Sequence, residues 1–264
     1  MIHLLFSAGL VLALSACAAR VPPRPSGQAT PDPAAIDAFA TATRACRGFR
    51  SLTAELSLSG RAGGDKIRGR VVAGLETGGA IRLEGLAPFG APVFILAGRN
   101  ERGTLLLPRD HRVLRDTAIA TVLERLTGLA LAADDLRLMV SGCLTDGASP
   151  SDGRRWASGW QAVTLGPDRI AYLRTLQGQP VVVGADYGAW HVDYAEHASG
   201  WPHTVRVRVA ADATTDITAR VGQLETNTTI DPAAFVVNVP PGTDSMTLDE
   251  LRSVAPLVPK APAP

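Results

Sequence analysis

The sequence predicts a mainly β (α+β) protein: a single curved antiparallel sheet, or incomplete barrel, of about eleven strands, with a helical lid that encloses an apolar cavity. Apolar and polar residues alternate along successive segments, Gly-rich turns join these segments, and two short helical patterns interrupt the strands. A chain of 264 residues that is 46% hydrophobic and 5% aromatic suits one large β domain, or two small ones, with an aliphatic core.

The first sixteen residues are expected to be a signal peptide. Leu4–Ala16 is an almost entirely apolar run, as long as a signal-peptide core and too short to span a bilayer. It ends in Leu14-Ser15-Ala16-Cys17, which resembles the lipobox of bacterial lipoproteins. We therefore expect cleavage before Cys17 and its acylation, which would anchor the chain on a membrane. Met1–His3 departs from the pattern because it lacks Lys and Arg, and an ordinary secretory signal with a chance cysteine is the alternative.

Proline-rich segments flank the expected domain. Five prolines lie among the sixteen residues from Ala18 to Pro33, and proline disfavours helices and sheet interiors. The expected organisation is therefore a signal peptide (1–16), an acylated cysteine with a tether (17–33), the folded domain (34–255) and a proline-rich tail (256–264).

Two cysteines, Cys46 and Cys143, remain after Cys17. An exported protein occupies an oxidising compartment, so the sequence favours a disulfide between them. Two buried free thiols are the alternative.

The N-terminal half begins with a helix expected over Asp32–Arg47, in which Ile36 and Phe39 share a face. Alternating segments then indicate an antiparallel meander, with a turn-rich break at Gly60–Asp65. These segments are Leu52–Leu58, Ile67–Leu75 and Ile81–Glu84.

An apolar loop is expected next. Leu86–Ala97 is nearly all apolar, although Pro88, Gly90 and Pro92 force a loop before a strand begins at Val93. Loops normally face water, so this one is either packed or meets a partner or a membrane.

The expected lid is a pair of short helices after strands at Thr104–Leu107 and Val113–Leu114. Asp116 is expected to cap the first helix, and Gly128 to end it. Asp134 and Asp135 are interpreted as capping the second helix, Asp135–Val140, which ends at Gly142.

Strands resume after a polar loop at 145–155, and a closing helix is expected over Leu248–Val254. The expected strands are Trp160–Leu165, Ile170–Leu176, Val181–Gly184, Trp190–Tyr194, Thr204–Ala210, Ile217–Thr229 and Phe235–Val239.

Several short motifs occur in an order and at a spacing that resemble a known family of proteins. Leu83-Glu84-Gly85, Pro88-Phe89-Gly90, Leu126-Thr127-Gly128-Leu129, Asp135-Leu136-Arg137 and Gly142 resemble the outer-membrane lipoprotein receptor LolB. Asn227 to Phe235 and Val239-Pro240-Pro241-Gly242 look like the carboxyl region of the periplasmic carrier LolA. Together these motifs are similar to the LolA/LolB lipoprotein-carrier superfamily, whereas the extra cysteine pair and the polar loop depart from LolB.

The resemblance implies a cavity that binds acyl chains of lipids or lipoproteins and a protruding loop that inserts into the membrane. Phe89 would take the place of the exposed hydrophobic residue on that loop. Each cavity candidate is equally compatible with ordinary core packing. The candidates are Leu56, Leu58, Val71, Ile81, Leu83, Val93, Ile95, Ile119, Val122, Leu123 and Leu126.

The same resemblance implies transfer or insertion of acyl chains at the periplasmic face of the outer membrane, with a LolA-like carrier as a partner. No cofactor, metal or enzymatic activity is expected: His191, His197 and His203 match no zinc motif, and no hydrolase motif occurs. The 26 basic and 25 acidic residues form no basic block, which disfavours nucleic acid. The alternative is a structural or assembly envelope lipoprotein with a filled core and a protein partner.

Overall fold

The computed structural model describes residues 23–144, 149–210, 212–254 and 257. The expected signal peptide, the lipidation site Cys17 and the first part of the tether lie outside the described residues. So do residues 145–148 of the polar loop and all of the proline-rich tail except Leu257.

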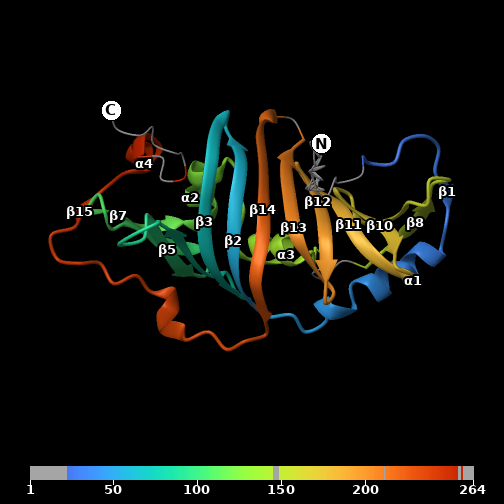
Figure 1. Cartoon of the computed structure of the whole chain (residues 1–264), viewed down its shortest axis with the longest axis horizontal. Coiled ribbons are helices and arrows are strands. Elements are labelled where there is room, and N and C mark those ends of the chain that lie inside the picture. The colour runs from blue at the N-terminus through green and yellow to red at the C-terminus, as the bar shows by residue number, and fades with distance from the viewer. Residues whose placement is uncertain (1–22, 145–148, 211, 255–256, 258–264) are drawn as a thin grey trace, which may run out of the picture.

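A single open, curved sheet forms the body of the molecule (Figure 1). Its neighbouring strands within the described residues are antiparallel, except for the short parallel pair β15–β7. The expected mainly β, single curved antiparallel sheet is thereby confirmed, and in the part of the chain that the structure describes it holds fifteen strands rather than about eleven. In spatial order they are β1 (Thr30–Pro31), β8 (Asp152–Arg155), β9 (Gln161–Gly166), β10 (Arg169–Leu176), β11 (Gln179–Tyr187), β12 (Trp190–Ala198), β13 (Trp201–Val209), β14 (Asp212–Thr226), β2 (Ser51–Ala62), β3 (Asp65–Glu76), β4 (Ala80–Leu86), β5 (Phe94–Arg99), β6 (Arg102–Leu107), β7 (Arg112–Ala118) and β15 (Asp244–Ser245).

The β2–β3 hairpin is longer than the sequence suggested. Its register runs without interruption from Ser51↔Glu76 to Ala62↔Asp65, so Gly60 to Ala62 belong to the strand and not to a turn-rich break. The turn is only two residues long because Gly63 and Gly64 supply φ angles of 56° and 91°, which the tightest hairpins require.

Short helices cover parts of the sheet, and α2 and α3 lie behind it in Figure 1. Gly128 and Gly142 end α2 and α3 in the left-handed conformation, as expected, with φ of 73° and 75°. The bounds are α1 (Ala34–Ala42), η1 (Arg44–Cys46), α2 (Ile119–Thr127), α3 (Ala133–Ser141), η2 (Pro232–Phe235) and α4 (Leu248–Val254).

The caps expected at the N-termini of the two lid helices were wrong. Asp116 lies in β7, where its carboxylate accepts a hydrogen bond from Arg102, and α2 begins after Ala118 without a side-chain cap. Asp134 and Asp135 lie inside the first turn of α3. Their carboxylates accept instead from the Gly79 amide and the Tyr187 hydroxyl, because tertiary partners compete with the local capping role.

The expected last strand, Phe235–Val239, was also wrong. Its first residue ends the 3₁₀ helix η2, and the residues that follow form no strand. Pro232 fixes φ at the start of η2, and the Asp231 carboxylate accepts from the Ala233 amide, which stabilises a turn over an extended backbone. Phe235 is buried, with the Arg99 guanidinium over its ring.

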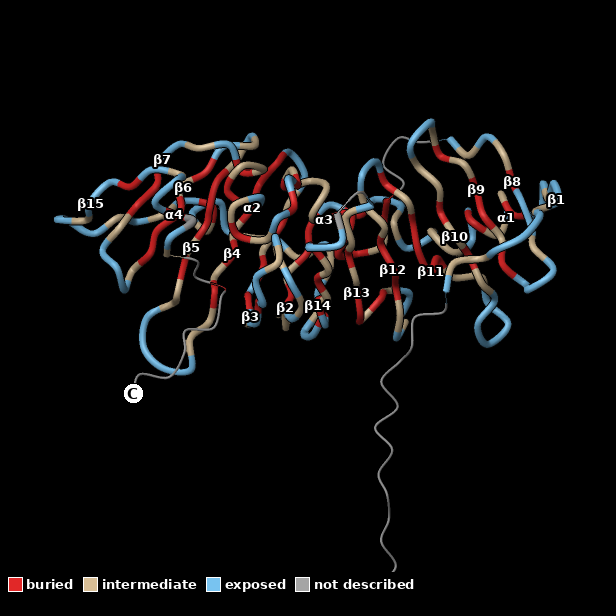
Figure 2. The backbone as a smooth tube through the Cα atoms, turned by 90° about the horizontal axis from the view of Figure 1, so that it is seen from above, coloured by how far each residue is buried: buried red, intermediate tan, exposed pale blue. Residues whose placement is uncertain are grey.

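The core follows from the alternation of the strands. Buried residues alternate with more exposed ones along much of β2, β3 and β4, as the colours along the backbone in Figure 2 indicate. Two buried sets, one on the sheet and one on α2 and α3, therefore face each other and enclose the space described next.

Candidate functional site

An apolar cavity of about 90 Å³ lies between the sheet and the helices α2 and α3. Its one hydroxyl-bearing side chain, Thr127, donates to the Leu123 carbonyl of its own helix. The wall therefore offers nothing that would hold water, and it suits hydrocarbon. The lining residues are Leu56, Leu58, Val71, Leu83, Phe94, Leu123, Leu126, Thr127, Leu129, Leu131, Leu136, Met139, Val140, Val205, Val207, Ile217, Ala219 and Leu257.

Six of the eleven cavity candidates line this space. They come from three strands and one helix: Leu56, Leu58, Val71, Leu83, Leu123 and Leu126. Strand alternation accounts for the four on β2, β3 and β4, and the spacing of three residues accounts for the pair on α2.

The other five candidates lie elsewhere. Ile81, Ile119 and Val122 are fully buried in the surrounding core, and Val93 lines a neighbouring groove. Ile95 lies between the buried Phe94 and Leu96 on β5, so its side chain points to the opposite face of the sheet.

Two sets of lining residues were missed by the sequence analysis. Strands β13 and β14 contribute Val205, Val207, Ile217 and Ala219, and α3 contributes Leu136, Met139 and Val140. The alternation of β13 and β14 was visible in the sequence. What was not visible is that β14 pairs with β2, since their paired residues Asp216 and Arg61 are far apart in the chain.

A larger groove of about 1020 Å³ adjoins the cavity. The two spaces share Leu58, Phe94 and Leu257. Leu257 is buried, and its carbonyl accepts a hydrogen bond of 3.1 Å from the Arg68 amide. The pairing of β4 with β3 ends at Arg70, so the edge of β3 at Arg68 is not covered by β4. Leu257 occupies this uncovered edge, between the cavity and the groove.

Helix α4 precedes Leu257 and begins with a capping box. The Thr247 hydroxyl accepts from the Glu250 amide at 3.3 Å, and the Glu250 carboxylate accepts from the Thr247 amide at 2.7 Å. That amide and the nearby Arg112 guanidinium lower the pKa of Glu250 to about 2. Leu251 of the same helix is buried in the core, so the box orients α4 on the domain.

Phe89 lies on the loop between β4 and β5 with 88% of its surface exposed. The Arg109 guanidinium donates to the carbonyls of Phe89 and Ala91, which braces the loop backbone. The aromatic ring itself is therefore presented to solvent on a supported loop, at the border of the groove that Pro88 lines.

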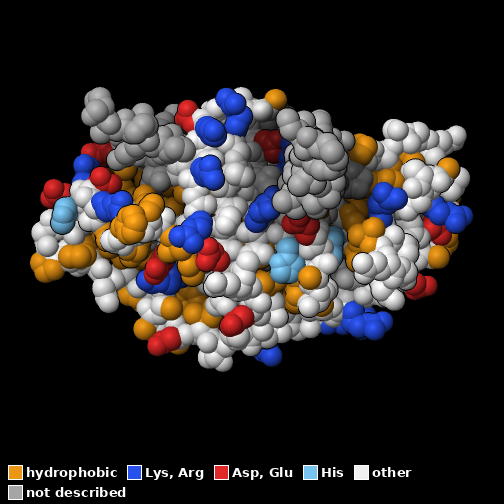
Figure 3. All heavy atoms as spheres, viewed as in Figure 1, with side chains coloured by type: hydrophobic (Ala, Val, Ile, Leu, Met, Phe, Trp, Pro, Cys, Tyr) orange, Lys and Arg blue, Asp and Glu red, His pale blue; other side chains and the backbone are white. Residues whose placement is uncertain are grey.

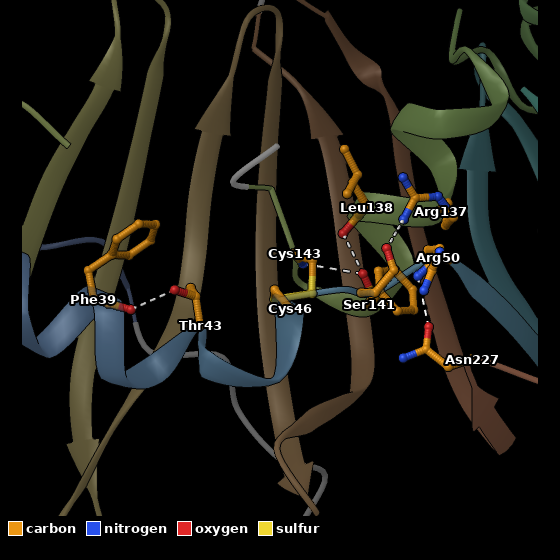
Figure 4. The surroundings of a disulfide bond; sticks show 10 residues. Phe39, Thr43, Cys46, Arg50, Arg137, Leu138, Ser141, Cys143 and Asn227 are labelled. Carbon is orange, nitrogen blue, oxygen red and sulfur yellow. Dashed lines mark hydrogen bonds between the residues drawn. A yellow bond between two sulfur atoms is a disulfide. The ribbon is translucent and has the colours of Figure 1, made fainter. Parts of the chain in front are cut away.

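The lid is tied to the N-terminal segment (Figure 4). The expected disulfide joins Cys46 of η1 to Cys143 after α3, with a Cα–Cα separation of 5.5 Å. Arg137 of α3 is only 2% exposed. Its guanidinium donates to Asp134 and to the Phe49 carbonyl and lies over the Phe49 ring. These contacts hold the position of α3 above the sheet.

The three histidines of β12 and β13 each bind a single acceptor group within the protein. His191 binds the Asp186 carboxylate, whereas His197 and His203 bind the carbonyls of Val182 and Val221. Within the described ranges, no three or more His, Cys, Asp or Glu residues are grouped so that they could hold a metal ion. No helix in that part of the chain combines the length and apolarity needed to cross a membrane.

Comparison with known proteins finds similarity in structure alone: no family model and no curated protein matches the sequence. A LolA superfamily protein from Nitrosomonas europaea is 8% identical, with a TM-score of 0.45 over 79% of this chain and 98% of that chain. A DUF1329 family protein from Desulfovibrio piger is 14% identical, with a TM-score of 0.43 over 78% and 97%. The Mycobacterium tuberculosis lipoprotein LppX is 12% identical, with a TM-score of 0.32 over 79% and 100%.

One of these similar structures is thus named for the superfamily that the sequence motifs resemble. At TM-scores below 0.5, such similarities do not assign an activity, so the function has to be inferred from the cavity, groove and loop of this chain.

Proposed function

We propose that this protein is a membrane-anchored periplasmic lipoprotein that binds acyl chains of lipids or lipoproteins and transfers or inserts them at the outer membrane. The observation that carries the proposal is the apolar cavity, which shares three residues with an open groove beside the exposed Phe89. An acyl chain gains about 0.8 kcal/mol for each methylene that it buries, so an apolar cavity is sufficient for binding without any catalytic group.

The cavity must enlarge to hold a chain. Its volume of about 90 Å³ is below the roughly 150 Å³ of an engineered apolar cavity that admits benzene. Movement of Leu257 away from the sheet edge would join the cavity to the groove, because this side chain belongs to both walls. We infer that Leu257 gates the path of the acyl chain.

The proposed anchor is acylated Cys17, and the proposed membrane-contacting residue is Phe89. The lipobox at Cys17 supports the anchor, and Ala18 rather than Asp after it favours the outer membrane under the enterobacterial sorting rule. The exposed ring on a braced loop supports membrane insertion at Phe89. A LolA-like carrier is the partner that the sequence resemblance implies.

Native mass spectrometry with lipid extraction tests the proposal. The chain from residue 17, carrying Cys17→Ser behind a general secretion signal, is purified from a periplasm. We expect about one bound acyl lipid per protein. Two substitutions in the cavity wall should act in opposite directions: Ala219→Leu fills the cavity and lowers occupancy, whereas Leu126→Ala enlarges it and preserves or raises occupancy.

Comparing these two variants separates a change in cavity volume from a general loss of folding stability. Leu126→Ala costs about 2–5 kcal/mol of folding stability, so loss of lipid through instability would appear in this variant first. A lipid-free, folded protein in all three forms would contradict the carrier function and favour a structural lipoprotein that binds a protein partner.

A further inference from the structure

The outer face of the sheet, opposite the helices, carries paired charges across its middle. Strands β12, β13, β14, β2 and β3 lie side by side there. Asp193 pairs with Arg208 at 2.7 Å, and Asp216 pairs with Arg206. The carboxylates of Asp193 and Asp216 are therefore neutralised by arginines of β13.

The groove on the same face has an excess of positive charge. Lys66, Arg68 and Arg220 line it and form no ion pair with any described residue. Arg109 also lines it and binds only loop carbonyls among the described residues, while Asp110 is the single acidic side chain of the lining. Figure 3 shows Lys and Arg side chains gathered over β2 and β3 on this face. The groove thus attracts anions.

Arg24, in the segment expected to be a free tether, is bound to this same face. Its guanidinium contacts the carboxylates of Asp186 and Asp193 at 3.3 and 3.2 Å and lies 4.3 Å from the centre of the Tyr172 ring. It also donates to the carbonyls of Ala185 and Val192 at 3.0 Å. This set of contacts is a clamp, which we name the Arg24 clamp.

The clamp shortens the distance that the tether can span. Six residues lie between Cys17 and Arg24, so the seven Cα–Cα steps that join them reach about 25 Å when fully extended. Without the clamp, the chain from Cys17 to the start of α1 at Ala34 could reach roughly 60 Å. Strand β12, which carries Asp193, is four strand spacings away from β3, which carries Arg68. This distance across the sheet is about 19 Å.

We propose that this outer face docks flat on an anionic lipid bilayer, with the Arg24 clamp holding the basic groove and the Phe89 loop against the membrane that holds the anchor. The inference rests on the proposed function for its anchor at Cys17 and its loop. Charge complementarity and the short chain before Arg24 identify the bilayer surface as the occupant. The loop between β4 and β5 projects to the side of the sheet opposite α2 and α3 (Figure 2), as docking requires.

Vesicle partitioning tests whether the basic groove binds anionic lipid. The full chain from residue 17 with Cys17→Ser, which lacks the anchor, is mixed with phosphatidylcholine vesicles that contain or lack one third phosphatidylglycerol. We expect partitioning into the anionic vesicles only, weakened by salt. The triple variant Lys66→Gln, Arg68→Gln, Arg220→Gln should partition about 100-fold more weakly. The matched control, Arg44→Gln, Arg47→Gln, Arg154→Gln, loses the same charge on other surfaces and should change little.

The orientation of the protein on the membrane tests the role of the Arg24 clamp. In the lipidated chain on the anionic vesicles, a fluorophore at Ser59→Cys in the groove should be quenched by spin-labelled lipid, and Arg24→Ala should reduce this quenching several-fold. Partitioning that ignores lipid charge, an equal loss in both triple variants, or quenching unaffected by Arg24→Ala would overturn the proposal. The partitioning assay requires no bound acyl chain, so a protein that docks but carries no lipid would refute the carrier function alone.

Discussion

At the scale of single residues, neighbouring positions have separate roles because the strands alternate. Phe94 lines the cavity, whereas the next residue, Ile95, points to the opposite face of the sheet. Leu257 is the residue whose role the local sequence least suggests, since it lies in a proline-rich segment and yet belongs to the wall of both cavity and groove.

We expect Leu257→Ala to speed the uptake of a fluorescent fatty acid, because the substitution removes the side chain that separates the two spaces. Stopped-flow fluorescence of the Cys17→Ser chain measures the rate. Leu144→Ala, also a buried leucine but outside both linings, is the matched control for loss of packing. An equal rate in all three proteins would show that Leu257 does not limit uptake.

At the scale of elements, α4 is the helix that precedes Leu257 along the chain. The helix is held by the Thr247–Glu250 capping box and by the ion pair of Glu250 with Arg112 at 2.6 Å. The lowered pKa of Glu250, about 2 against an ordinary value of 4.5, means that this stabilisation is fully present above about pH 4.5 and is lost as the pH falls through about 2.

Hydrogen exchange of the α4 amides should therefore accelerate between pH 4.5 and 2 relative to the intrinsic rate. In Glu250→Gln the protection should already be lower at pH 7 and should not change over that acidic range, because no carboxylate remains to titrate. Exchange measured by mass spectrometry tests both. Identical pH profiles in the two proteins would contradict the assignment of this stabilisation to Glu250.

At the scale of the whole molecule, the disulfide connects distant parts of the chain. Cys46 and Cys143 are 97 residues apart, and the bond fixes the end of the lid helix α3 against η1. A cross-link that closes a loop of this length stabilises the fold chiefly by restricting the unfolded chain.

We expect the double variant Cys46→Ser, Cys143→Ser to lower the free energy of unfolding by roughly 3–5 kcal/mol. Urea denaturation measures this loss, and the wild-type chain in the presence of a reductant should approach the same value. An unchanged midpoint in both cases would mean that the bond adds no stability to the domain.

Several features were predictable because they depend on neighbours in the chain. Alternation along β2, β3 and β4 indicated strands with one buried face, and Gly128 and Gly142 indicated helix ends. The cysteine count and the expected export of the chain favoured the disulfide that the structure contains. The apolar loop singled out Phe89, and the structure places its ring in solvent.

Predictions from the local sequence failed where a residue interacts more strongly with a distant part of the chain than with its sequence neighbours. Asp116 left its expected cap because Arg102 lies on the neighbouring strand, and β8 formed in the polar loop because β9 and β1 pair with it. Arg24 is bound by carboxylates from strands that lie more than 160 residues further along the chain, so no pattern near Arg24 could indicate that contact.

The sequence by itself therefore determined the class of fold, most of the strands, the lid helices and the residues that face the interior. Only the tertiary structure decided which of those interior residues surround a space and which fill the core. The pairing of β14 with β2 brings Val207 and Ile217 opposite α2 and α3, and Leu257 closes the edge. The physical reason is that periodicity records which face of an element is buried, whereas a cavity depends on how closely distant elements approach.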